Sequence, residues 1–200
     1  MSKTFVIITK LEKKFLLYFY TFIGRIHLML LGIKCKKVWI NGNLCLDSIN
    51  KTSLSIGRNV IINSRLGANK IGYNCPTIFQ CRGGKVSIGD NVGISNSSFI
   101  SWGADIIIED NVLIGAGCKF YTSDFHSISY EDRVLNNDKN IRNGEIFIKE
   151  GAFIGAGSTI LKNVTIGKHS IIGACSVVTK SVPDGEIWAG NPAIFIRKLK

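Results

Sequence analysis

The sequence predicts an all-β fold, a parallel coil in which three short strands make up each turn. The first observation is an unbroken six-residue repeat of apolar anchors: Ile148, Ile154, Ile160, Ile166, Ile172 and Val178. A helix repeats its apolar face every ~3.6 residues and a strand every ~2, so this period fits neither element alone. The second observation is a small or β-branched residue four positions after each anchor: Ala152, Ser158, Val164, Ser170, Ser176 and Val182. We therefore expect two inward positions per hexapeptide, stacked into one core.

Earlier parts of the chain carry the same repeat less regularly. The anchors there are Ile88, Ile94, Ile100, Ile108, Ile114 and Phe120, preceded by Ile56 and Ile71 as weaker opening positions. Such repeats bury their apolar face only against neighbouring copies, so several turns must stack. We predict an N-terminal helical and apolar segment over residues 1–45, the coil over residues 46–190 and a C-terminal tail over residues 191–200.

Glycine and asparagine occupy the predicted corners. The chain has 21 glycines against three prolines, and asparagines recur at one place in the repeat: Asn59, Asn91, Asn111 and Asn163. Both residue types enter the left-handed region at lower cost than others do. We expect these residues to make turns.

The six cysteines include no C-x-x-C pair, and no histidine lies at metal-ligand spacing from them. These observations favour reduced thiols, a cytoplasmic protein and no metal. Cys75 and Cys118 fall on small inward positions, where burial would raise the pKa of a thiol. The three histidines, His27, His126 and His169, lie in unrelated parts of the chain, which excludes a zinc site of clustered histidines.

The N-terminal segment permits three interpretations. Residues 15–33 are long enough to approach a membrane span, but Arg25 near the centre would cost about 2.5 kcal/mol or more. The segment could instead form one or two helices that cover the open end of the coil. It could also lie in a membrane interface, with lysines near lipid phosphates: Lys10, Lys13, Lys14, Lys34, Lys36 and Lys37.

The net charge of +11 restricts the class of partner. No module interleaves aromatic and basic residues, so nucleic acid is not expected. Phosphate-bearing small molecules, an acidic acceptor or an anionic membrane fit the charge better.

The repeat is interrupted once, by a polar excursion over about residues 121–147. Long loops within a compact domain are frequently functional. This one contains His126, and imidazole titrates near neutral pH, so His126 is a candidate general base.

Three stretches near the C-terminus carry a family resemblance: FIGAGSTILKNVTIG, SIIGACSVVTKSVPDG and AGNPAIFIRKL. Over about residues 50–200 the chain resembles the hexapeptide-repeat acyltransferases, which fold as a left-handed parallel β-helix. The resemblance is closest to maltose and galactoside O-acetyltransferases and to their relatives that acetylate lipopolysaccharide and capsule.

The resemblance implies roles for individual residues. His126 would be the general base, Asp124 would orient its imidazole, and the backbone N–H of Ala156 would stabilise the oxyanion. Acetyl-CoA would be the acyl donor, bound without a metal in a groove between two coils of a homotrimer. The residues implied to bind it are Ala156, Ala174, Thr179, Lys180 and Arg197.

The N-terminal segment is more hydrophobic than the cap of maltose acetyltransferases, which favours a surface-polysaccharide acceptor assembled at the inner face of the membrane. The expected activity is O-acetylation of a sugar hydroxyl, with peripheral membrane contact through this segment. Two alternatives stay open: an N-acetyltransferase for an amino sugar or sugar nucleotide, and a non-catalytic solenoid scaffold.

Overall fold

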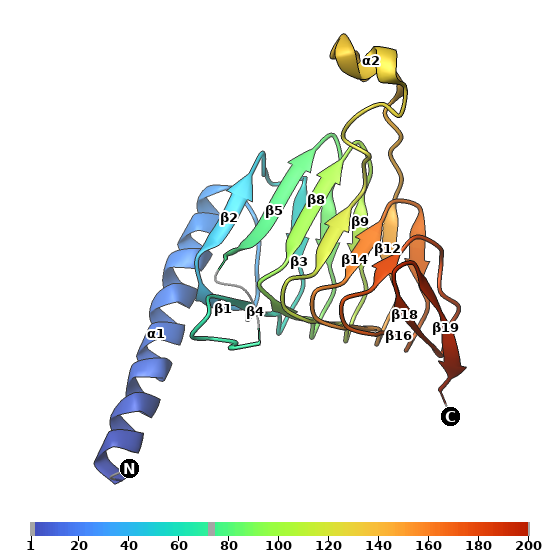
Figure 1. The fold of residues 1–200 in the computed structure, drawn as a ribbon. Helices are drawn as coiled ribbons and strands as arrows, with labels where there is room; N and C mark the ends of the chain where they lie inside the picture. The colour runs from blue at the N-terminus through green and yellow to red at the C-terminus, as the bar shows by residue number, and fades with distance from the viewer. Residues whose placement is uncertain (1–2, 72–74, 200) are drawn as a thin grey trace.

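A computed structural model describes residues 3–71 and 75–199 of the chain. Within these residues a long helix, α1 (Lys3–Leu30), precedes a coil of short strands that fall into three sheets (Figure 1). Successive turns of the coil add parallel strands to each sheet. The predicted parallel all-β coil with three strands per turn is confirmed.

The sheets differ in the number of strands. The eight-stranded sheet contains β1 (Trp39–Gly42), β4 (Ile61–Ser64), β7 (Gly93–Ser95), β10 (Leu113–Ile114), β13 (Phe153–Ile154), β16 (Ile171–Ile172), β18 (Glu186–Gly190) and β19 (Ala193–Lys198). The six-stranded sheet contains β2 (Leu44–Asp47), β5 (Thr77–Arg82), β8 (Ser98–Trp102), β11 (Lys119–Tyr121), β14 (Thr159–Leu161) and β17 (Val177–Val178). The five-stranded sheet contains β3 (Leu54–Ile56), β6 (Val86–Ile88), β9 (Ile106–Ile108), β12 (Ile146–Ile148) and β15 (Val164–Ile166).

The two ends of the coil differ from the expected boundaries. Strand pairing begins at β1, within the segment expected to precede the coil. At the other end, β18 and β19 form an antiparallel hairpin, so most of the expected tail is a strand of the eight-stranded sheet.

The apolar core follows the hexapeptide positions. Every predicted inward side chain from Ile148 to Val182 is at most 3% exposed. The parallel register places similar side chains of successive turns on one another, for example Ile154 on Ile172. Full burial of one such side chain is worth about 1.5–3 kcal/mol, so these stacks stabilise the coil.

Two predicted anchors are wrong. Ile100 is half-buried and its neighbour Phe99 is fully buried, because five residues rather than six separate Phe99 from the buried Ile94. Phe99 stacks between Phe79 and Phe120, with ring centroids 5.0 and 4.8 Å apart. A shift of one residue moves a strand's inward set to its other face. Ile71 is 81% exposed and lies outside the strands.

The predicted corner asparagines adopt the left-handed conformation. The φ angles of Asn59, Asn91, Asn111 and Asn163 are 56°, 58°, 61° and 60°. Three of them also form a ladder, in which the Nδ2 of Asn59 donates to Asn91 (3.1 Å) and that of Asn91 donates to Asn111 (3.2 Å). The asparagines therefore both make the corners and connect successive turns.

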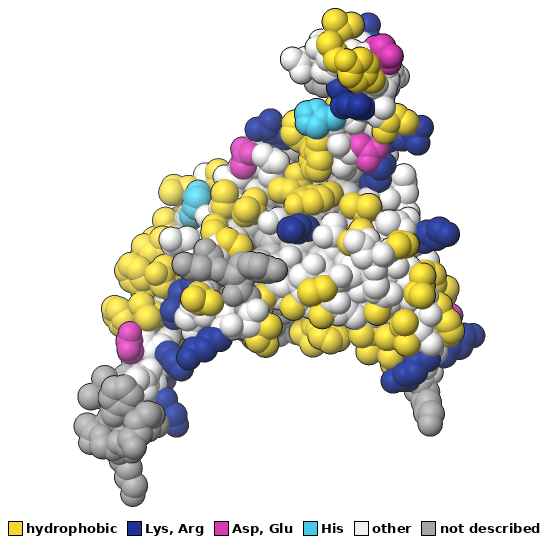
Figure 2. Space-filling view, viewed as in Figure 1, with side chains coloured by type: hydrophobic (Ala, Val, Ile, Leu, Met, Phe, Trp, Pro, Cys, Tyr) yellow, Lys and Arg dark blue, Asp and Glu magenta, His cyan; other side chains and the backbone are white. Residues whose placement is uncertain are grey.

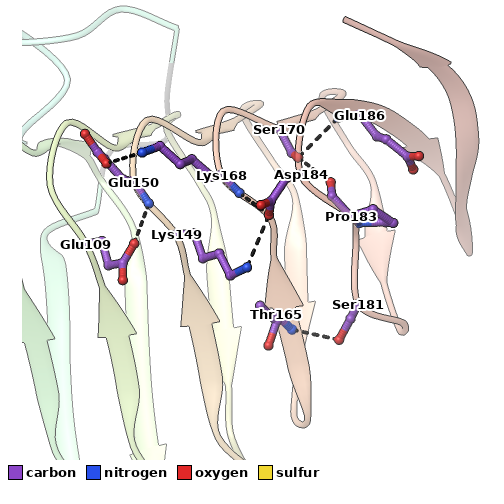
Figure 3. Close-up of polar contacts among 10 residues, drawn as sticks. All are labelled: Glu109, Lys149, Glu150, Thr165, Lys168, Ser170, Ser181, Pro183, Asp184 and Glu186. Atoms are coloured by element: carbon purple, nitrogen blue, oxygen red, sulfur yellow. Dashed lines mark hydrogen bonds and ion pairs between the residues drawn. The ribbon is translucent and has the colours of Figure 1, made fainter.

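Polar contacts continue along the edge of the coil that carries the ladder of Asn59, Asn91 and Asn111. We call its later corners the carboxylate edge (residues 149–152, 167–170 and 183–185; Figure 3). Asp184 accepts from the backbone N–H of Lys168 (2.8 Å) and from Nζ of Lys149 (3.2 Å). The Nζ of Lys168 lies 2.8 Å from a carboxylate oxygen of Glu150. Lys168 thus joins its turn to the turns before and after it, and the contact of Lys149 with Asp184 spans two turns.

The second half of helix α1 packs on the first strand of the coil. This half of the helix agrees with the interpretation in which a helix covers the open end of the coil. The hydroxyl of Thr21 donates to the carbonyl of Ile40 and accepts from its N–H, both at 3.0 Å. Gly24 faces the same residue, and a Cβ there would lie 2.6 Å from its Cδ1. No helix among the described residues has the length and apolarity that crossing a membrane requires.

Candidate active site

The excursion after β11 is clamped at its base. The backbone N–H of Gly144 donates to the carbonyl of Thr122 (2.8 Å), and that of Asp124 donates to the carbonyl of Arg142 (3.1 Å). The excursion leaves the coil from the edge between the six- and five-stranded sheets, here called the loop edge (residues 122–145, 162–163 and 179–181; Figure 1). Residues close to the clamp are therefore held relative to the coil.

His126 lies just beyond the clamp, with an exposed side chain. The preceding Phe125 has φ 60°, an uncommon value for a bulky residue. Its ring packs edge-on against Tyr121 and Trp102, at centroid distances of 5.6 and 5.9 Å. The backbone N–H of His126 donates to the carbonyl of Asp124 at 2.7 Å. The local fold thus presents the imidazole to solvent from a constrained turn.

The carboxylate of Asp124 pairs with the Nζ of Lys162, which lies at the next corner of the loop edge. Within the described residues, no hydrogen bond joins the Asp124 carboxylate to the imidazole of His126. Both partners of the ion pair are partly exposed to solvent, with side chains 30% and 21% exposed. The geometry therefore links Asp124 to the position of the loop rather than directly to the imidazole.

The outer part of the excursion contains α2 (Tyr130–Val134) and the 3₁₀ helix η1 (Asp138–Asn140). Asp132 accepts from the hydroxyl of Ser127 (2.9 Å) and from Nδ2 of Asn140 (2.6 Å). These hydrogen bonds, led by that from Asn140, lower the pKa of the Asp132 carboxyl. The excursion also has a hollow of about 450 Å³, lined by Ser127, Ile128, Ser129, Asn140, Ile141 and Arg142.

Ala156 and Ala174 lie on a different edge, between the eight- and six-stranded sheets, which we call the glycine edge (residues 115–118, 155–158 and 173–176). A Cβ on Gly115 would lie 2.5 Å from the backbone N of Ala156, and one on Gly155 would lie 2.5 Å from that of Ala174. Glycine is therefore required for the turns to approach. Ala156 is half-buried and Ala174 is exposed.

The other implied cofactor residues are exposed. Thr179 and Lys180 follow β17 and lie on the loop edge, where the excursion also leaves the coil. Arg197 lies in β19 opposite Ile187, and its Nη1 donates to the carbonyl of Lys198 at 3.2 Å.

One chain does not bring all the predicted site residues together. His126, Asp124, Thr179 and Lys180 share the loop edge, whereas Ala156 and Ala174 belong to the glycine edge, and the six-stranded sheet separates the two edges. A site that uses both edges at once needs a second chain.

The sequence did not predict a role for Lys162 or for the aromatic cluster beside His126. This cluster consists of Trp102, Tyr121 and Phe125. The guanidinium carbon of Arg82 lies 5.2 Å from the centroid of the Trp102 ring, and an Nη of Arg82 lies 3.6 Å from a carboxylate oxygen of Asp47. The only feature of the sequence that could have indicated Trp102 is its position, because this residue ends a strand at the edge from which the excursion leaves the coil. An aromatic face with nearby cations suits a sugar ring that carries acidic or phosphate groups.

The cysteines do not contribute a nucleophile to the loop edge. Cys118 is buried as predicted, and burial raises the pKa of its thiol to about 11. Cys75, also predicted to point inward, is only half-buried. Among the described residues, no three His, Cys, Asp or Glu side chains gather as a metal site would require.

Comparison with known proteins identifies the class. Residues 145–180 match the family described as bacterial transferase hexapeptide (six repeats). A putative acetyltransferase of Saccharomyces cerevisiae is 33% identical over 70% of this chain and 69% of its own length. The galactoside O-acetyltransferase of Lactococcus lactis is 30% identical over 77% of this chain and 74% of its own length.

A solved structure agrees in fold. The N-acyltransferase AntD from Bacillus cereus, in complex with dTDP and 3-hydroxybutyryl-CoA, superposes with a TM-score of 0.69 and 26% identity over 88% of each chain. The chain belongs to the hexapeptide-repeat acyltransferases. Membership of a family of enzymes argues against the non-catalytic scaffold.

Proposed function

We propose that this protein transfers an acetyl group from acetyl-CoA to a hydroxyl of a sugar in a surface polysaccharide, such as capsule, lipopolysaccharide or a precursor. The observation that carries the proposal is the exposed imidazole of His126 on a clamped turn, in a chain similar to a galactoside O-acetyltransferase. The remaining features of the family are proposed with it: a left-handed coil and a homotrimer.

His126 acts as general base in the proposed reaction. Its imidazole takes the proton from the acceptor hydroxyl while the hydroxyl oxygen attacks the thioester carbonyl. The backbone N–H of Ala156 donates to the oxygen on which negative charge develops. The imidazolium then returns the proton to the CoA sulfur as the C–S bond breaks. No acyl-enzyme is required, which agrees with the raised thiol pKa of Cys118.

The donor site is proposed to lie between two chains. Acetyl-CoA supplies the acetyl group as a thioester, held by the small residues Ala156 and Ala174 along the glycine edge of one chain. Thr179, Lys180 and Arg197 would bind its polar parts, because a lysine and an arginine suit phosphate groups. The loop edge of the neighbouring chain would bring His126 to the thioester, which is the role of the trimer.

N-acylation of an amino sugar or sugar nucleotide is the second candidate. One observation favours it: the similar AntD is an N-acyltransferase solved with dTDP. The guanidinium of Arg82, which lies over the ring of Trp102, would suit a nucleotide pyrophosphate as well as an acidic glycan.

The test follows CoA release from acetyl-CoA with a panel of neutral sugars, acidic glycans, amino sugars and nucleotide-linked amino sugars, using the wild type and His126→Ala. O-acetylation predicts release with hydroxyl acceptors and a loss of about 100-fold or more in the variant. Release with amine acceptors alone would establish the second candidate. Equal activity of His126→Ala would overturn the role of His126.

A further inference from the structure

Helix α1 carries an apolar stripe that the coil does not cover. Its outer side bears large side chains at helical spacing, each between 49% and 66% exposed: Leu11, Phe15, Tyr18, Phe19, Phe22 and Met29. Spacings of three and four residues place such side chains on one face. Figure 2 shows hydrophobic side chains along the outer side of α1. The helix itself extends past the end of the coil (Figure 1).

The opposite side of α1 changes character along its length. In the second half, Thr21, Gly24 and Leu28 pack toward β1. About two and three turns before Thr21 the same side carries exposed lysines, because Lys14 and Lys10 continue this spacing toward the N-terminus. The overhanging half of α1 is thus apolar on one side and basic on the other, which is the pattern of a helix that lies in a membrane interface.

The charge of the whole N-terminal region fits an anionic surface. Residues 1–46 contain eight basic residues and one acidic residue, Glu12, so they hold seven of the eleven net positive charges of the chain. A helix is about 10 Å across, close to one Debye length, so lysines on its far side still attract lipid phosphates.

A groove beside α1 extends the apolar surface toward the coil. It has a volume of about 980 Å³ and is lined by aromatic and basic residues together, among them Phe22, Arg25, Lys36 and Trp39. Trp39 packs edge-on against Tyr18, at a centroid distance of 5.9 Å. Tryptophan and tyrosine favour the headgroup level of a bilayer, where one end of the ring is apolar and the other wet.

We infer that α1 and this groove dock the protein onto a bilayer surface that contains anionic phospholipid. The apolar stripe enters the boundary between headgroups and acyl chains, and the lysines bind lipid phosphates. Thr21 and Gly24 fix α1 on the coil, so docking also sets the orientation of the coil on the membrane. The inference does not rest on the proposed chemistry.

Vesicle flotation tests the inference with the intact chain, using phosphatidylcholine vesicles with and without phosphatidylglycerol. We expect the wild type to float with the anionic vesicles, and weakly or not at all with neutral ones. The double variant Phe15→Ser/Phe22→Ser should bind about 10-fold less tightly or worse. The matched control is Val134→Ser/Leu135→Ser, which removes an equally exposed apolar pair from α2 and its C-cap and should float like the wild type.

A charge variant keeps the inference testable if the double variant fails to fold. Lys10→Gln/Lys13→Gln/Lys14→Gln should weaken binding about 10-fold or more, and added salt should weaken binding of the wild type but affect this variant less. The inference is overturned if the wild type does not float with anionic vesicles or if both α1 variants float like the wild type. Light scattering tests the alternative that the stripe is a contact between subunits. This alternative would hold if the wild type does not bind vesicles and Phe15→Ser/Phe22→Ser forms a smaller oligomer.

Discussion

His126 is positioned by its neighbours along the chain, and no hydrogen bond from the described residues reaches its imidazole. Phe125 anchors the turn through its ring, and Asp124 anchors it through the ion pair with Lys162 on the next corner. The ion pair is therefore of interest for activity more than for stability, because exposed or half-exposed pairs contribute only ~0–1 kcal/mol.

Lys162→Ala tests this positioning role. We expect kcat/KM to fall about 10-fold, because a turn that carries a general base loses precision when its support is removed. The midpoint of thermal unfolding should change little, and Lys162→Arg should restore much of the activity. The control is Lys149→Ala, which removes a similar ion pair with Asp184 on the carboxylate edge. Equal activity of the two alanine variants would contradict the role.

At the scale of the elements, the corners decide which turns can stack. Gly155 and Gly185 are corner glycines with opposite surroundings. A Cβ on Gly155 would meet backbone atoms of the next turn at 2.5–2.8 Å. At Gly185 a Cβ would meet nothing within 4 Å, but φ is 70°. The first glycine is required by space and the second by conformation.

Alanine substitutions separate these two requirements. Gly155→Ala should lower the free energy of unfolding by about 1–3 kcal/mol, because the backbone of the next turn must move. Gly185→Ala should cost about 1 kcal/mol, the price of the left-handed conformation for a residue with a Cβ. Denaturant titration of the two variants measures the difference, and an equal loss would show that the turns tolerate separation at the glycine edge.

The carboxylate edge predicts a dependence of stability on pH. The hydrogen bond from the backbone N–H of Lys168, and then that from Lys149, lower the pKa of Asp184 in the folded state. Its stabilising effect is therefore present above the ordinary carboxyl pKa of about 4 and is lost as the pH falls through the lowered value. Asp184→Asn should lower Tm by roughly 1–3 °C at pH 7. Thermal melts from pH 7 to pH 3 should show the two proteins converging, and a constant difference would exclude the carboxylate charge as the cause.

The sequence predicts those parts of this molecule that repeat. The six-residue period places the core from Ile148 to Val182, and asparagine at corners predicts the left-handed turns, because both depend on local sequence alone. The period fails at Ile100, where a short corner shifts the register and the Phe99 stack takes over. It also gives no sign of the Lys162 partner of Asp124, because that contact joins residues 38 positions apart on adjacent turns.

The whole molecule poses a different problem from its parts, because the residues proposed for one reaction lie on two edges of the coil. In one chain, His126 and Ala174 are separated by the six-stranded sheet. If the site forms between chains, a defect on the loop edge of one subunit and a defect on the glycine edge of another can be combined in one oligomer.

Co-expression of two inactive variants tests this arrangement. His126→Ala removes the base, and Ala174→Trp fills the proposed donor groove at an exposed position, so each homotrimer should be inactive. In every mixed trimer, one of the three sites pairs an intact loop edge with an intact glycine edge, so we expect about one third of wild-type activity. Two affinity tags isolate the mixed trimers for the assay of CoA release. Mixed trimers without activity would place the whole site within one chain, whereas recovered activity would require that the loop edge and the glycine edge of different subunits act together.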